Sequence, residues 1–299
     1  MMRLRMAMIA VCALALTACG REAPPTPPEA PSAAAEATAN GARLDAVLAA
    51  QSAETKARYP ARRPKETLEF FGVAPGMTVV DTLPGDVWYA GILLDYLGPQ
   101  GKVIGVDYAP QMWQQFGEYS PDPAESARWT TEFVANMQAK RGADAAAVAA
   151  LQFDAIPDTA AGTVDVVLLS RSIHHLMRLE AQGAWLTKAL ADIGRLLKPG
   201  GIVGVEAHRA PESASDAWAS GEQGYVKQSA VIAAFEKAGF ELVGSSEMHA
   251  NPKDQPTEKD FVWRLPPTLA TSENDPALRA QLTAIGESDR MTLKFRKRA

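Results

Sequence analysis

The stretch that decides the fold is VDVVLLSRSIHHLMRLEAQGAWLTKALADIGRLLKPGGIVGVE, residues 164–206. It begins with a predicted strand at 164–170, whose continuous apolar run is led by Asp165 and is typical of a strand buried on both faces of a parallel sheet. Residues 185–197 carry apolar side chains at helical spacing, and Lys198-Pro199-Gly200-Gly201 stops that helix. A second apolar strand follows at 202–206. This order of strand, helix and strand predicts one βαβ unit of a doubly wound sheet.

The same alternation extends outward from this unit in both directions. Short β-branched or apolar runs predict further strands at 78–82, 102–106, 148–153, 242–246 and 291–295. Longer helical patterns predict helices at 88–97, at 110–142 with an interruption at Pro121 and Pro123, and at 229–238 with Ser229 as the cap. We therefore predict an α/β fold with a doubly wound, mostly parallel sheet.

One connection in this pattern is unusually long. A proline-rich segment of about forty residues separates the last two predicted strands, far above the usual length of a loop. We predict that it is a flap or a packed excursion that covers the site.

The N-terminus has the pattern of an export signal. Arg3 and Arg5 precede an apolar run too short to span a bilayer comfortably, and Leu16-Thr17-Ala18-Cys19 then resembles the lipobox of bacterial lipoproteins. The resemblance implies a signal peptide at 1–18, a lipid on Cys19 and, because Gly20 follows, a place in the cell envelope facing the periplasm, at the outer membrane. The alternative is an uncleaved or ordinary signal in which Cys19 is incidental.

Composition sets the limits for the rest of the chain. Residues 19–41 are rich in Pro and Ala and are expected to form a partly extended tether, which leaves 42–299 as the globular domain. The net charge of −5 includes no basic block, so we expect no nucleic-acid partner. If Cys19 is lipidated and Cys12 is removed, no thiol is left for a nucleophile, a metal site or a disulfide.

Several motifs together resemble a known family. The turn 198–201, the later Ala238-Gly239-Phe240 and the order of the elements resemble class I S-adenosylmethionine-dependent methyltransferases over roughly residues 60–297. More closely, Pro84-Gly85-Asp86-Val87-Trp88-Tyr89, Asn251-Pro252-Lys253-Asp254 and Ser288-Asp289 resemble an uncharacterised, often secreted group of predicted methyltransferases. The resemblance implies a Rossmann-like fold with an antiparallel last strand, S-adenosyl-L-methionine as cofactor and a small-molecule methyl acceptor.

Three acidic residues lie at or just after the carboxyl ends of predicted strands, where ligands of open α/β sheets bind. Asp81 could hold the ammonium of the cofactor, or it could be a solvated or helix-capping acid. Asp107 could accept hydrogen bonds from both ribose hydroxyls, because two carboxylate oxygens match a vicinal diol; the alternative is a turn acid. Asp154 could bind the adenine amino group, or it could be one acid among several in its loop.

Further cofactor candidates lie around the first loop. Gly85 would let the backbone approach the amino-acid end of the cofactor. Asp86 and Val87 stand where the related group has glycine, and each added Cβ narrows that approach. Tyr89 could wall the sulfonium or the adenine, since aromatic faces attract cations, or it could be plain core. Ser170 ends the fourth strand and is the last cofactor candidate.

The methyl acceptor is expected beside residues 170–175. His174 and His175 are the candidates for a catalytic base, with a structural role as the alternative. Neighbouring helical residues diverge by about 100°, which argues against both histidines binding one metal ion. Arg171, His208 and Tyr225 are candidates for binding the substrate.

Two functions fit this sequence. The first is S-adenosylmethionine-dependent methyl transfer by a lipid-anchored enzyme. The alternative is a non-catalytic ligand-binding envelope lipoprotein that keeps the methyltransferase fold, since fold alone does not settle function.

Overall fold

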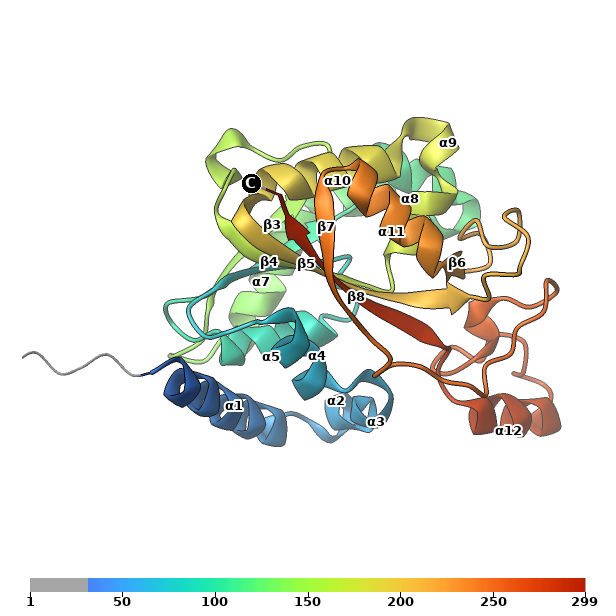
Figure 1. Cartoon of the computed structure of the whole chain (residues 1–299), viewed down its shortest axis with the longest axis horizontal. Coiled ribbons are helices and arrows are strands. Elements are labelled where there is room, and N and C mark those ends of the chain that lie inside the picture. Colours follow the sequence, from blue (N-terminus) through green and yellow to red (C-terminus); the bar gives the residue numbers. More distant parts are fainter. Residues whose placement is uncertain (1–31, 299) are drawn as a thin grey trace, which may run out of the picture.

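The computed structural model describes residues 32–298, and a mixed sheet lies at the centre of this part of the chain (Figure 1). The order of its strands is β3-β2-β1-β4-β5-β8-β7, with the short β6 beside β5. The strands are β1 (Thr78–Thr82), β2 (Lys102–Asp107), β3 (Ala147–Gln152), β4 (Val164–Ser170), β5 (Leu197–Ala210), β6 (Val226–Lys227), β7 (Phe240–Ser246) and β8 (Arg290–Lys297).

The pairing directions confirm the predicted doubly wound sheet. Strands β1 to β5 pair in parallel, whereas β8 runs antiparallel to both β5 and β7. The ends of β1, β2, β4 and β5 therefore meet at one edge of the sheet, which we call the carboxyl edge. The first residue of β8 lies at the same edge, because Arg290 pairs with His208 of β5.

Helices cover both faces of the sheet. They are α1 (Ala33–Ala50), α2 (Ala53–Ala57), α3 (Tyr59–Arg62), α4 (Pro64–Phe71), α5 (Trp88–Tyr96), α6 (Pro110–Trp113), α7 (Pro123–Lys140), α8 (Ile173–Arg178), α9 (Glu180–Gly183), α10 (Trp185–Leu196), α11 (Gln228–Lys237) and α12 (Pro276–Ile285), with 3-10 turns η1 (Gln114–Tyr119), η2 (Asp158–Ala160) and η3 (Val262–Arg264). The layer formed by α8, α10 and α11 packs on one face, and α1, α4, α5 and α7 pack on the other.

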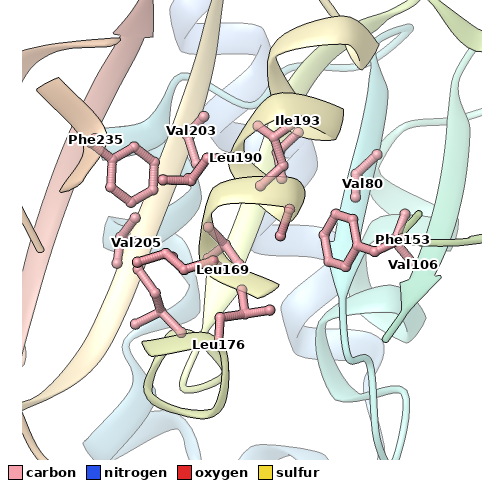
Figure 2. Close-up of a cluster of buried hydrophobic side chains, with 14 of the residues drawn as sticks. Val80, Val106, Phe153, Leu169, Leu176, Leu190, Ile193, Val203, Val205 and Phe235 are labelled. Atoms are coloured by element: carbon pink, nitrogen blue, oxygen red, sulfur yellow. The ribbon is translucent and has the colours of Figure 1, made fainter. Parts of the chain in front are cut away.

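The two faces of the sheet each have an apolar core. On the first, side chains of neighbouring strands meet those of the covering helices (Figure 2). The labelled members are Val80, Val106, Phe153, Leu169, Leu176, Leu190, Ile193, Val203, Val205 and Phe235. Burial of such side chains is the main favourable contribution to folding, so these cores fix where the strand ends lie.

Two local predictions were wrong. The expected tether to residue 41 overlaps α1, which begins at Ala33 after Ser32 accepts a hydrogen bond from the Ala35 amide. Alanine has the highest intrinsic helix propensity, and this favours helix over an extended chain in that segment. Ser229 does not cap α11; its hydroxyl instead donates to Glu212.

The long segment between β7 and β8 is a packed excursion. It contains η3 and α12 and lies at the carboxyl edge, beyond the end of β5 in Figure 1. None of the helices within residues 32–298 is long and apolar enough to cross a membrane.

Candidate functional site

Three adjoining cavities lie at the carboxyl edge. The central cavity, of about 220 Å³, is lined by residues 83–86, 170–171, 262–263, 265–268 and 287–288 and by three histidines. The Asp107 cavity, of about 620 Å³, shares residues 83–85 with it. The aromatic cavity, of about 570 Å³, shares His175 and Trp263 with the central one. The excursion between β7 and β8 therefore forms one wall, as predicted.

The loop after β1 has left-handed backbone at alternate positions. The φ angles of Leu83, Gly85 and Val87 are 48°, 53° and 56°. The Val87 amide donates to the Pro84 carbonyl at 2.8 Å, which closes the turn. Gly85 lines both the central and the Asp107 cavity. The loop thus keeps a path that glycine would favour, although Leu83 and Val87 carry a Cβ.

Asp107 ends β2 and lines the Asp107 cavity. Its Oδ1 accepts from the Tyr108 amide at 2.8 Å, and its Oδ2 accepts from Trp113 Nε1 at 3.0 Å. Burial raises the pKa of this carboxyl to about 6, although both hydrogen bonds favour the charged form. Each carboxylate oxygen has two lone pairs, so both still have acceptor capacity.

Asp81 and Tyr89 lie beneath the site rather than in it. Asp81 Oδ2 accepts from the Ala90 amide at 3.0 Å, in the first turn of α5, and burial raises the pKa of this carboxyl to about 7. Tyr89 is buried in the core edge-on against Trp88, with ring centroids 4.7 Å apart. Neither residue lines the three cavities, so the helix-binding and core alternatives fit them better.

Asp154 lies away from the three cavities. Its amide donates to Asp192 of α10, and its carboxylate is 3.4 Å from Lys188 Nζ of the same helix. The side chain is exposed and lines none of these cavities. This placement does not support the predicted contact with adenine, because the turn after β3 faces α10.

His174, His175 and His208 come together at the central cavity. The rings of His174 and His175 have centroids 3.9 Å apart, and that of His208 is 5.5 Å from His174. We expected the side chains of His174 and His175 to diverge, and this prediction was wrong. The helical rotation separates only the directions of their Cβ atoms, and the two rings turn back toward each other. No group of three or more possible ligands in residues 32–298 is arranged to bind a metal ion.

The three imidazoles are neutral near neutral pH. Burial lowers the pKa of all three, and the charge of Arg178 helps to bring that of His175 to about 3. A base is most effective when its pKa lies near the working pH. These histidines are therefore better suited to hydrogen bonding and orientation than to strong base catalysis. His208 Nδ1 lies 2.6 Å from the Ser288 hydroxyl.

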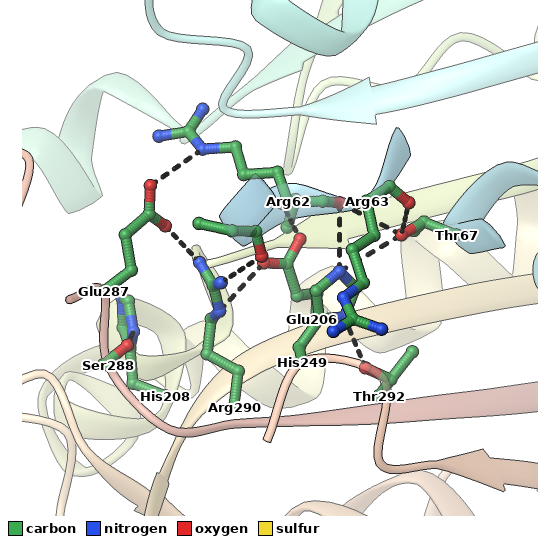
Figure 3. A network of polar contacts seen from close by, with 12 residues as sticks. Arg62, Arg63, Thr67, Glu206, His208, His249, Glu287, Ser288, Arg290 and Thr292 are labelled. Atoms are coloured by element: carbon green, nitrogen blue, oxygen red, sulfur yellow. Dashed lines mark hydrogen bonds and ion pairs between the residues drawn. The ribbon is translucent and has the colours of Figure 1, made fainter. Parts of the chain in front are cut away.

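A buried ion network supports the floor of the central cavity (Figure 3). Ser170 donates to Glu206 Oε2 at 2.8 Å, and Arg290 Nε lies 3.3 Å from Glu206 Oε1. Glu287 bridges Arg290 and Arg62, at 3.5 Å from Arg62 Nε. Burial opposes the charge on Glu206, but nearby positive charges, above all that of Arg290, together with the Ser170 hydrogen bond outweigh it and lower the pKa to about 2. Arg62, Glu287 and Arg290 carry no motif that would single them out in the sequence.

Tyr225 has a structural role next to the site. Its hydroxyl donates to Asp254 Oδ2 at 2.9 Å, and the Asp289 amide donates to the same oxygen at 3.0 Å. The backbone amide of Asn251 in turn donates to Asp289 Oδ1 at 2.7 Å. The motifs 251–254 and 288–289 thus hold each other and place Ser288 beside His208. Tyr225 does not line the three cavities, so the predicted substrate contact is not supported.

The predicted residues therefore fall into two groups. The central cavity brings together Gly85, Ser170, Arg171, His174, His175 and His208, with Asp107 in the adjoining one. Asp81, Tyr89, Asp154 and Tyr225 lie outside. Cys19 lies outside the residues that the structure describes.

Comparison with known proteins agrees with this architecture. Residues 84–205 match a family model described as a methyltransferase domain. No curated protein matches the chain.

Several solved structures are similar in fold. A SAM-dependent methyltransferase from Aquifex aeolicus is 20% identical over 68% of this chain and 92% of that chain, with a TM-score of 0.45. A 1,6-didemethyltoxoflavin-N1-methyltransferase from Burkholderia thailandensis is 17% identical over 91% and 93%, with a TM-score of 0.41. A putative methyltransferase from Bacillus halodurans is 15% identical over 80% and 100%, with a TM-score of 0.43.

The order of the strands and the antiparallel β8 define the fold independently of these similarities. The chain has the Rossmann-like fold of class I S-adenosylmethionine-dependent methyltransferases.

Proposed function

We propose that this chain transfers a methyl group from S-adenosylmethionine to a small-molecule acceptor. The observation that carries the proposal is the continuity of the Asp107 cavity with the central cavity through residues 83–85. Asp107 has free acceptor capacity for a ribose diol, and a Cβ added at Gly85 would meet no atom closer than 3.9 Å. The residues present therefore fit the cofactor.

The chain's own residues would act mainly by alignment. The bound cofactor supplies an electrophilic methyl group, and its transfer needs the acceptor atom in line with the bond that breaks. The buried ion network holds Ser170, while α8 holds His174 and His175 at the central cavity. Neutral imidazoles can accept or donate a hydrogen bond there, which would orient an acceptor hydroxyl, amine or thiol. The aromatic cavity adds apolar surface beside them.

Calorimetric titration with S-adenosylmethionine and S-adenosylhomocysteine tests the cofactor site. Asp107→Asn removes the charge of the carboxylate, and Asp158→Asn is the matched control because Asp158 is fully exposed. We expect Asp107→Asn to weaken binding about tenfold to a hundredfold, in line with charge-assisted hydrogen bonds of about 1.5–3 kcal/mol. No binding by the unchanged protein would favour a non-catalytic binder, and equal losses in both variants would remove Asp107 from the site.

We also propose that Cys19 carries the lipid that anchors the protein in the cell envelope, facing the periplasm. The support is the sequence pattern of residues 1–20, which precede the described part of the chain. Cys19→Ser should release the protein from the detergent-extracted membrane fraction. Unchanged membrane association would contradict the proposal.

A further inference from the structure

Arg171 stands out among the residues of the central cavity. It follows β4 directly, with a left-handed φ of 54°, and its amide donates to the Glu206 carbonyl at 2.6 Å. The backbone that carries the side chain is thus fixed at the carboxyl edge. Arg171 Nε is buried and has no hydrogen-bond partner in residues 32–298. This leaves a cation with unused donors at the wall of the cavity.

The acids of this region are paired with other arginines. Glu206 pairs with Arg290, Glu287 pairs with Arg290 and Arg62, and Asp86 pairs with Arg58. The histidines are neutral and supply no negative charge. The charge of Arg171 lowers the pKa of both Glu206 and Asp81, but its guanidinium forms no ion pair with either within residues 32–298. A partly buried cation with unused donors costs free energy unless a ligand fills them. The region is therefore prepared for an anionic group of a ligand.

We propose that Arg171 binds the α-carboxylate of the methionyl end of the cofactor. The inference rests on the proposed function. With the ribose at Asp107, the path through residues 83–85 leads the amino-acid end of the cofactor into the central cavity, where Arg171 lies. The guanidinium offers paired donors in the geometry that a carboxylate matches. This proposal assigns Arg171 to the cofactor, whereas the sequence predicted that it binds the substrate.

Two nucleosides test this assignment without knowledge of the acceptor. S-adenosylhomocysteine carries the methionyl-type carboxylate, whereas 5′-methylthioadenosine has the same adenosine and thioether but lacks the amino-acid end. Calorimetry on the full chain compares the unchanged protein with Arg171→Gln and with Arg171→Lys, which keeps the charge. Arg195→Gln is the matched control, because Arg195 pairs with the exposed Asp158 and lines none of the three cavities.

Arg171→Gln should weaken S-adenosylhomocysteine about tenfold to a hundredfold, as expected for a lost charge-assisted hydrogen bond. It should change the affinity for 5′-methylthioadenosine by less than about twofold, and Arg171→Lys should fall between the two for S-adenosylhomocysteine. Arg195→Gln should leave both affinities within about twofold. This difference between two ligands is not expected from a purely structural role.

Other outcomes would overturn the assignment. If both nucleosides bind and Arg171→Gln changes neither, the carboxylate binds elsewhere, and only this inference fails. If Arg171→Gln weakens both equally, Arg171 supports the fold of the site rather than the carboxylate. If the unchanged protein binds neither nucleoside, the proposed function fails and the inference fails with it.

Discussion

Val87 offers a direct test of strain in the loop after β1. It has φ 56° and ψ 31° at the N-cap of α5, a conformation that is rare for a β-branched residue. A left-handed conformation costs a non-glycine residue about 1–2 kcal/mol. Glycine avoids that cost but loses about 0.4–1 kcal/mol through the greater freedom of its unfolded chain. The balance predicts that glycine is better than alanine here by about 0.5–1 kcal/mol.

The comparison of Val87→Gly with Val87→Ala isolates this effect. Both variants lose the two methyl groups that pack against the α5 side of the core, so they differ mainly in the Cβ. Ala191→Gly in α10 is the matched control, because Ala191 is exposed on a regular helix, where glycine costs about 1 kcal/mol. Urea unfolding gives the three free energies. At position 191 glycine should be less stable than alanine. If Val87→Gly were likewise less stable than Val87→Ala, the reasoning would be refuted.

Two further predictions concern buried carboxyls. Glu206→Gln should lower the free energy of unfolding by about 3 kcal/mol, because it leaves the buried charge of Arg290 without the negative charge of Glu206. Glu132→Gln, in the exposed pair with Arg128, should change it by less than about 0.5 kcal/mol. Equal effects of the two variants in urea unfolding would contradict this. Asp81→Asn keeps the acceptor for Ala90 and removes a group whose pKa is raised from 3.8 to about 7 on folding. As pH rises from about 4 to 7, Asp81 loses its proton in the unfolded chain before it does so in the folded one, so the unchanged protein becomes less stable. The free energy of unfolding of Asp81→Asn should therefore rise relative to that of the unchanged protein, by at most about 1.4 kcal/mol per pH unit. A constant difference across that range would rule out the raised pKa.

The sheet was accessible from the sequence because its strands have a strong pattern. The apolar run 164–170 and the turn 198–201 predicted β4 and the helix α10 that precedes β5. The ends of β5 were not predicted: it runs from Leu197 to Ala210, beyond the apolar residues 202–206. Beyond that run, Ala207 and His208 pair with β8, about eighty positions later in the chain, and Arg209 and Ala210 pair with β6. Pairing of that kind leaves no local signal.

The site was predictable where its residues follow strands directly. Ser170 ends β4, Arg171 follows it and Asp107 ends β2, so all three lie at the carboxyl edge, where the rule expects ligand-binding residues. The rule also selected Asp154, but the direction of the turn after β3 decides which way such a residue faces, and here it faces Lys188. Arg62 and Arg290 come from the two ends of the domain. Only tertiary packing brings them to Glu206 and Glu287.

The backbone of the loop 83–87 was also beyond sequence reasoning. Asp86 and Val87 in place of glycine suggested a narrowed approach for the cofactor. The structure instead keeps left-handed backbone at Leu83, Gly85 and Val87, since the ends of the loop are fixed by β1 and α5. The surrounding fold can hold a residue in an unfavourable conformation when it over-determines the path of the chain.

The central claim is that the carboxyl edge of the sheet binds S-adenosylmethionine. A crystal structure of the protein with S-adenosylhomocysteine tests it most directly. The account predicts the ribose hydroxyls at hydrogen-bond distance from Asp107 and the amino-acid end in the central cavity beside residues 83–86. A nucleoside bound elsewhere, or a ribose that does not contact Asp107, would contradict the account.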